Sequence, residues 1–191
     1  MAEIRTIAVI GAGIPGRVIA LASALGGYRT IVEDILPSSL RNAESEIRAQ
    51  LSRFSALGSV PAEQAEAAFQ RLEYASTVAE AAREADLVIE SVPDEMESKI
   101  EIFTLLDKIC RPDTILASNT SSLSVTEIAS VTYRAKKILG MRFALPPHGR
   151  DILHLVRARE TDDETIAACT LAGRRMGKQV VLLEEHASQS T

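Results

Sequence analysis

The feature that most constrains the fold is an apolar run that ends directly in a glycine-rich loop. Residues 6–10 read TIAVI, a short stretch rich in β-branched residues, and GAGIPG follows at once. Such a run, bounded by glycine, is typical of a buried parallel strand. Residues 14 to about 25 are predicted to form a helix that ends at Gly26 and Gly27. A strand, a glycine turn and a helix form the first half of a βαβ unit, which indicates an α/β fold.

The same alternation continues to the end of the chain. Further strands are predicted over residues 29–34, 72–76, 86–92, 114–119, 136–143, 152–158 and 179–184. Helices are predicted over residues 37–54, 61–71, 96–110, from 124 and from about 161 to 177. Strands that alternate with helices predict a doubly wound, mostly parallel sheet of the Rossmann type. We expect residues 1–185 to form this single domain and residues 186–191 to form a polar tail.

Two of the predicted helices carry start signals. Ser124 with Glu127, and Thr161 with Glu164, have the spacing of a capping box, in which the first residue accepts a hydrogen bond from the third helical amide. We therefore expect Ser124 and Thr161 to be the residues that cap these helices.

Composition and charge exclude several classes of function. The 191 residues are 46% hydrophobic and 25% charged, which is a globular composition. A net charge of −5 argues against a nucleic-acid partner, and no apolar run approaches the length of about 18 residues that a membrane span needs. The chain opens without a signal-peptide pattern, and Cys110 and Cys169 are expected to be buried and reduced. We expect a soluble cytoplasmic protein with no metal site.

The glycine loop has the spacing of a dinucleotide-binding motif. Gly11, Gly13 and Gly16 form the pattern G-x-G-x-x-G, with Ile14 and Pro15 between the second and third glycines. In such a loop the glycines allow a tight turn, a close approach of backbone to a pyrophosphate, and close packing of helix on strand. Pro15 is acceptable because the first helical turn needs no amide donor. The alternative is that the glycines only form a turn.

The end of the second predicted strand supports the first interpretation. Asp34 lies at this end, where a carboxylate can accept hydrogen bonds from the hydroxyls of an adenosine ribose and repel a 2′-phosphate. No arginine follows the strand directly. The predicted cofactor is therefore NAD rather than NADP, unless the acidic residues here are merely solvated.

Three segments carry a resemblance to a known family. They are IAVIGAGIPGRVIALASALGGY, DLVIESVPDEMESKIEIF and DTILASNTSSLSVTEIA. Together they resemble the NAD-binding domain of the 3-hydroxyacyl-CoA dehydrogenases, and the resemblance extends from residue 4 to about residue 184. ASNTSSL is the most specific string. The resemblance implies a Rossmann-type domain of an oxidoreductase that uses NAD in fatty acid metabolism.

The resemblance also implies roles for four polar residues. It places Asp94, where the family usually has glutamate, and Lys99 near the nicotinamide-side ribose. The family serine that matches Ser121 hydrogen-bonds the substrate oxygen and the reactive end of the cofactor. Asn119 and Ser121 follow a predicted strand, at the edge where open α/β sheets bind ligands. Spacing alone leaves alternatives open, because Lys99 also stands four residues after Glu95, as in a surface salt bridge worth roughly 0.2–0.5 kcal/mol, and serines are typical of turns.

One segment departs from the family pattern. Family members use a histidine that takes the hydroxyl proton as the hydride leaves, and a glutamate that orients this histidine. When GMRFALPPHGRDILHLV is aligned with the family pattern G-x-H-F-x-N-P, Arg142 takes the histidine position and Leu145 the asparagine position. His154 falls at the glutamate position, and His148 matches a family histidine that is not the catalytic one.

This departure allows two interpretations of Arg142. An arginine cannot be a general base near neutral pH, because its guanidinium stays protonated. Its planar fork suits the polarisation of a carbonyl or a bidentate contact with a carboxylate. Arg142 as electrophile and His154 as acid is therefore one hypothesis, for the reduction of a ketone. The alternative is loss of the pair, with Arg142 turned to solvent and His154 packed beside Val156.

In family members, the chain continues beyond the part that resembles residues 4–184. Relatives pass through a Pro-Gly turn into a helical domain that supplies a further catalytic asparagine, substrate contacts and a dimer interface, and neither the turn nor that domain is found in the 191 residues. We expect the surface that it covers in relatives to be repolarised, self-associated into a homo-oligomer or covered by a partner.

Three hypotheses about function follow. The chain is an NAD(H)-binding protein in which standard 3-hydroxyacyl-CoA oxidation is impaired or lost. Alternatively, it is a small oxidoreductase that uses Ser121, Arg142 and His154 on an altered substrate, either an acyl-CoA or a small 3-oxo or 3-hydroxy acid. In the third hypothesis it is half of a split enzyme that a separate helical chain completes.

Overall fold

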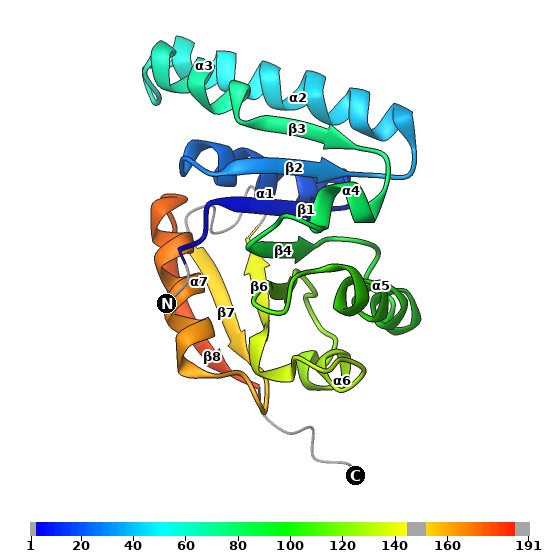
Figure 1. Cartoon of the computed structure of the whole chain (residues 1–191). Helices are drawn as coiled ribbons and strands as arrows, with labels where there is room; N and C mark the ends of the chain where they lie inside the picture. The colour runs from blue at the N-terminus through cyan, green and yellow to red at the C-terminus, as the bar shows by residue number, and fades with distance from the viewer. Residues whose placement is uncertain (1–2, 145–151, 186–191) are drawn as a thin grey trace.

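An eight-stranded sheet forms the centre of the computed structural model, which describes residues 3–144 and 152–185 (Figure 1). The strands lie in the order β3-β2-β1-β4-β5-β6-β7-β8. Their bounds are β1 (Thr6–Ile10), β2 (Arg29–Glu33), β3 (Leu72–Ala75), β4 (Leu87–Glu90), β5 (Ile115–Ser118), β6 (Ile138–Phe143), β7 (Ile152–Arg157) and β8 (Gln179–Glu184). Within the described sheet, β6 and β7 run antiparallel and the other neighbouring pairs run parallel. The prediction of a doubly wound, mostly parallel sheet is confirmed.

Helices cover both faces of this sheet, and each face has its own apolar core. The helices are α1 (Ile14–Leu25), α2 (Pro37–Ala56), α3 (Ala62–Gln70), α4 (Val78–Ala82), α5 (Met96–Ile109), α6 (Val125–Ala129) and α7 (Asp163–Arg175), with a 3₁₀ turn at Ala135–Lys137. Buried residues of α1, α2, α3 and α7 belong to one core, and those of α4, α5 and α6 belong to the other. The chain leaves β1 towards β2 and β3, and later returns to place β4 on the other side of β1. This reversal of strand order is where open α/β sheets bind ligands.

Of the two predicted helix-capping residues, one is confirmed and the other is wrong. Ser124 caps α6 by accepting a hydrogen bond from the amide of Glu127 at 3.1 Å, as predicted. Thr161 does not cap α7, so this prediction is wrong. Asp162 takes that place and accepts from the amide of Thr165, because the hydroxyl of Thr161 instead bonds the carbonyl of Ile138 within the core.

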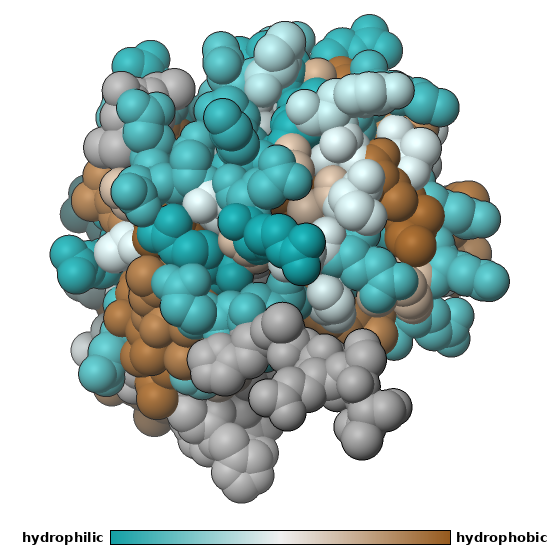
Figure 2. Space-filling model, turned by 90° about the horizontal axis from the view of Figure 1, so that it is seen from below, coloured by the Kyte–Doolittle hydropathy of each residue, from teal (hydrophilic) through white to brown (hydrophobic). Residues whose placement is uncertain are grey.

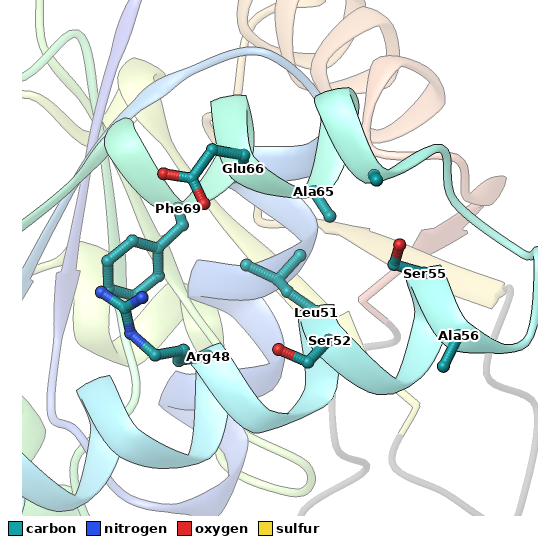
Figure 3. Close-up of a pocket in the computed structure, with 9 residues that line it drawn as sticks. Arg48, Leu51, Ser52, Ser55, Ala56, Ala65, Glu66 and Phe69 are labelled. Atoms are coloured by element: carbon teal, nitrogen blue, oxygen red, sulfur yellow. The ribbon is translucent and has the colours of Figure 1, made fainter.

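The helical hairpin of α2 and α3 lies at the β3 edge of the sheet, opposite the β8 edge (Figure 1). Ala43, Ile47 and Leu51 recur every four residues and form the buried stripe of the otherwise polar helix α2. Figure 3 shows Arg48 of α2 against the ring of Phe69 of α3, and its guanidinium carbon lies 3.7 Å from the ring centroid. The hairpin therefore combines a narrow apolar contact with a cation–π pair.

Other predictions concern single residues. Cys110 and Cys169 are buried free thiols, as predicted. Within residues 3–144 and 152–185, no helix is long and apolar enough to cross a membrane. Leu145, His148 and the predicted tail 186–191 lie outside the described residues.

Candidate functional site

The glycine loop lies beside β4, at the reversal of strand order. Gly11 has φ +102°, and a Cβ there would lie 2.8 Å from the carbonyl oxygen of Ser91. A Cβ on Gly16 would lie 1.8 Å from the carbonyl oxygen of Gly11. A Cβ on Gly13 would meet only the Pro15 ring, at 3.8 Å. Two glycines are thus required by the packing of the loop, while Gly13 leaves open backbone for the close approach of a ligand.

Asp34 links the end of β2 to this loop. Its Oδ2 accepts a hydrogen bond from the amide of Ala12 at 3.0 Å, and its Oδ1 accepts one from the amide of Leu36 at 2.9 Å. An ionised carboxylate has about four lone-pair sites, so about two remain for the hydroxyls of a ribose. The apolar side chains of Ile35 and Leu36 follow Asp34, and both are exposed. These acceptor oxygens and apolar side chains fit the adenosine half of NAD.

Glu33 precedes Asp34 and is buried at the end of β2. Burial of its carboxyl, together with the smaller effect of the negative charge of Asp34, raises the pKa of Glu33 from about 4.5 to about 7. The folded protein therefore binds more protons at Glu33 than the unfolded chain does between these two pH values. The contribution of Glu33 to stability consequently falls as the pH rises from about 4.5 to about 7.

Replacing Glu33 with glutamine is expected to remove this pH dependence. Between pH 5 and pH 8, the unmodified protein should lose about 1–3 kcal/mol of stability relative to Glu33→Gln, because only the glutamate acquires a buried charge. Urea denaturation of both proteins at the two pH values measures the difference. A difference that stays constant with pH would show that Glu33 does not titrate in this range.

Lys99 belongs to the N-terminal part of α5, and its side chain is buried. Its Nζ lies 2.8 Å from Oε1 of Glu90 and 3.6 Å from Oδ1 of Asp94, and it donates to the carbonyl of Val92. The side chain is only 1% exposed, so the alternative of a surface salt bridge with Glu95 is wrong. The amide of Lys99 does bond the carbonyl of Glu95 at 3.1 Å, but its side chain is directed inward to Glu90 and not along the helix surface to Glu95.

Glu90 is the functional-site residue that the sequence analysis missed. It ends β4, is fully buried, and accepts hydrogen bonds from Lys99, from the amide of Val92 at 2.7 Å and from the hydroxyl of Ser118 at 2.7 Å. The signal was present in the sequence, because a carboxylate within the apolar run DLVIESV requires a buried partner.

Asp94 extends this network to Ser121. Its Oδ2 accepts hydrogen bonds from the hydroxyl of Ser121 at 2.8 Å and from the amide of Ser121 at 3.1 Å. Burial alone would raise the pKa of Asp94, but hydrogen bonds from Thr120 and Ser121 and the charge of Lys99 hold the pKa below its ordinary value. Asp94 is thus kept ionised and fixes the serine that the family resemblance assigns to the substrate.

Asn119 connects the ends of three strands. Its amide donates to the carbonyl of Glu90 at 2.8 Å, and its Oδ1 accepts from the amide of Phe143 at 3.0 Å. Asn119 therefore fixes β5 against β4 and against the residue that follows Arg142 on β6.

Arg142 and His154 face each other across the antiparallel pair β6 and β7. Each is partly buried. The Nε of Arg142 is inaccessible to solvent and has no hydrogen-bond partner among the described residues. In such a pair, the two Cβ atoms lie about 4.5–5.5 Å apart, so the side chains are close enough to act on one ligand.

A single cleft of about 1210 Å³ brings most of the predicted site residues together. Predicted residues that line it are Gly11, Gly13, Pro15, Asp34, Asp94, Lys99, Asn119, Ser121, Arg142 and His154. Gly16 is instead buried behind the loop, and Ile14 is exposed outside the lining. The apolar lining was also not predicted from the sequence; it includes Ile35, Leu36, Val78, Val92, Ile102 and Leu183. The cavity of about 370 Å³ between α2 and α3 in Figure 3 contains none of the motif residues.

Comparisons with known proteins identify the family of this chain. The family described as 3-hydroxyacyl-CoA dehydrogenase, NAD binding domain, matches residues 6–186. The chain belongs to this family. This NAD-binding domain has a Rossmann fold, and its cofactor is NAD.

Relatives of this 3-hydroxyacyl-CoA dehydrogenase domain are longer proteins. A probable 3-hydroxybutyryl-CoA dehydrogenase of Bacillus subtilis is 36% identical over 94% of this chain and 62% of its own length. The structure of the 3-hydroxybutyryl-CoA dehydrogenase of Escherichia coli K12 has a TM-score of 0.90 and 32% identity, over 96% of this chain and 39% of its own. That of (S)-3-hydroxybutyryl-CoA dehydrogenase from Ralstonia eutropha has a TM-score of 0.91 and 29% identity, over 96% of this chain and 65% of its own. The chain thus spans less than two thirds of each of these relatives.

Proposed function

We propose that this 3-hydroxyacyl-CoA dehydrogenase domain binds NAD(H) but is impaired in standard 3-hydroxyacyl-CoA oxidation. The observation that carries the proposal is the pairing of Arg142 with His154 on facing strands inside the cofactor cleft. By resemblance to the family, these positions hold the proton-accepting histidine and its glutamate. Oxidation of a hydroxyl requires that its proton be removed, and a protonated guanidinium cannot accept it.

The chain's own residues are suited to hold the cofactor. The open backbone at Gly13 allows close approach of the pyrophosphate, and Asp34 accepts hydrogen bonds from the adenosine ribose. By resemblance to the family, Asp94 and Lys99 would hold the ribose on the nicotinamide side, and Ser121, which Asp94 fixes, would contact the substrate oxygen. Bound NAD supplies the acceptor or donor of the hydride. The binding half of the site is complete in this proposal, whereas proton transfer is not.

The double variant Arg142→His with His154→Glu tests which part is missing. We expect it to oxidise NADH with acetoacetyl-CoA about 10- to 100-fold faster than the unmodified protein, because a positioned acid–base group contributes about 10²–10⁴-fold. The facing register places the new histidine beside the new glutamate. Absorbance of NADH at saturating cofactor measures the rate.

Two controls make this result interpretable. Arg142→His alone should gain less than the double variant, since the histidine then faces His154 instead of a carboxylate. Calorimetric titration with NADH shows whether each variant still binds cofactor. A double variant that binds NADH yet stays at the rate of the unmodified protein would contradict the proposal that replacement of the pair causes the impairment.

A second candidate is an oxidoreductase that acts on an altered 3-keto or 3-hydroxy substrate. It is supported by the position of Arg142, His154 and Ser121 in one cleft, where the guanidinium can stabilise the negative charge that develops on a reduced carbonyl. A structural neighbour described as a diketoreductase, with 27% identity and a TM-score of 0.90, acts on dicarbonyl compounds. NADH consumption by the unmodified protein with acetoacetate would favour this candidate over the first.

We also propose that residues 1–185 act as one unit whose β8 side packs against a helical domain. Leu182 and Leu183 of β8 are 44% and 38% exposed, and Leu183 lines the cleft. Figure 2, seen from the end where α6 lies in Figure 1, shows hydrophobic side chains in separate groups at the left and at the right of a mainly hydrophilic face. A contiguous apolar group of this kind is typical of an interaction surface, and a helical domain there would complete the split enzyme.

A further inference from the structure

The local packing of β6 directs Arg142 into the cleft. Gly140, two residues earlier and on the same face of the strand, lies under α6, where a Cβ would approach Val125 to 3.1 Å and Val156 to 2.9 Å. The helix thus covers the sheet as far as Gly140. Arg142 is the next residue on that face, and it lines the cleft beside Ser121 and Asn119.

The guanidinium of Arg142 forms no ion pair with any described side chain. The other cation that lines the cleft, Lys99, is paired with Glu90 at 2.8 Å. Arg142, by contrast, forms no ion pair within the described residues, and its buried Nε donates to none of them. A partly buried guanidinium without a partner is unfavourable, so a ligand that supplies acceptor oxygens is favoured at this place.

The neighbouring carboxylates are engaged elsewhere. Glu184 and Glu185 line the adjoining pocket together with Arg142. Glu185 caps α6, accepting from the amides of Val125 and Thr126 at 2.6 and 2.8 Å. Glu184 lies 3.4 Å from Nε of Arg157. Neither carboxylate forms an ion pair with Arg142.

We propose that Arg142 anchors a site for the free carboxylate of a small 3-oxo or 3-hydroxy acid. The guanidinium fork matches a carboxylate in two parallel hydrogen bonds, and His154 offers a second polar contact from the facing strand. A thioester carbonyl at the same place carries no charge and gains less from this fork. The inference rests on the proposed cofactor cleft, because the acid lies beside the nicotinamide end that Asp94 and Ser121 define.

The test uses acetoacetate and its uncharged ethyl ester. Each is titrated by NMR into the full chain with and without NAD⁺, a mixture that cannot transfer a hydride because both partners are oxidised. We expect acetoacetate to bind about 10- to 100-fold more tightly than the ester, and Arg142→Gln to abolish this preference. Arg159→Gln is the matched control, because Arg159 is exposed at the adjoining pocket and the substitution removes the same charge.

Three results would contradict the proposed carboxylate site at Arg142. Equal affinity for acetoacetate and the ester in the unmodified protein excludes recognition of the carboxylate, whether or not the Arg142 variant folds. An equal loss of affinity in Arg142→Gln and Arg159→Gln, or equal binding of inorganic phosphate, indicates general attraction of anions instead. NAD⁺ binding to the same samples is measured first, so a failure of the cofactor site is distinguished from a failure of the carboxylate site alone.

Discussion

Replacing Glu90 with glutamine is expected to lower the free energy of unfolding by about 3 kcal/mol. The substitution leaves the ammonium of Lys99 in a site where the side chain is 1% exposed, with Asp94 at 3.6 Å as the remaining carboxylate. Removal of one partner from a buried ion pair costs about 3–5 kcal/mol, because the other charge is then buried without compensation. Urea denaturation at pH 7 measures this loss.

The double variant Glu90→Gln with Lys99→Met is the control for this interpretation. It removes the buried ammonium, while the glutamine can still bond the amide of Val92 and the hydroxyl of Ser118. We expect it to recover at least half of the stability that Glu90→Gln loses. A double variant as unstable as the single one would contradict the ion-pair explanation and would assign the loss to packing. The double variant should bind NAD⁺ more weakly than the unmodified protein, since Lys99 and its contact with Asp94 are absent.

Alanine at Gly16 is expected to abolish NAD⁺ binding and to destabilise the fold by at least about 3 kcal/mol. Its Cβ would lie 1.8 Å from the carbonyl oxygen of Gly11, a distance that only displacement of backbone can relieve. Helix α1 would then shift away from β1, and the loop would lose the shape that the pyrophosphate requires. Thermal denaturation and calorimetric titration with NAD⁺ measure the two effects.

Gly13→Ala distinguishes the role of the loop in packing from its role in binding the cofactor. Gly13 has φ −64°, which alanine adopts without strain, and its Cβ would meet only Pro15 at 3.8 Å. We expect the stability to change by less than about 1 kcal/mol, while NAD⁺ affinity falls because the methyl group occupies the space of the approaching phosphates. If alanine at Gly13 destabilised the fold as much as alanine at Gly16, the steric distinction between these positions would be wrong.

Much of the fold and of the cofactor site could be predicted from the sequence, because it depends on local patterns. Short apolar runs located the strands, and the spacing of the glycines with Asp34 located the cofactor loop. The short helix α4 was missed: its five residues are too few to show a period, although Thr77 and Glu80 have the same capping spacing as Ser124 and Glu127. Its start is instead fixed by the hydroxyl of Thr77, which accepts from the amide of Glu80.

The predictions that were wrong or missing involve contacts between distant elements. Lys99 pairs with Glu90 on β4 rather than with the nearby Glu95, and the hydroxyl of Thr161 bonds β6 rather than capping a helix. The contact of Asn119 with the amide of Phe143 likewise depends on how β5 and β6 are placed. Local spacing carries no information on such pairs, since each depends on how elements far apart in the sequence pack against one another.

Because β6 and β7 pair through their backbones, the reactive side chains at positions 142 and 154 can change while the fold of the cleft stays the same. The backbone ladder holds positions 142 and 154 opposite each other whichever side chains they carry. Exchange of the two residues therefore changes the reactive groups without moving the cofactor loop, the buried pair of Lys99 and Glu90 or the helices. A set of paired substitutions at these two positions offers a way to vary acid, base and electrophile independently of fold stability, so this domain is a suitable scaffold for designing new reductases.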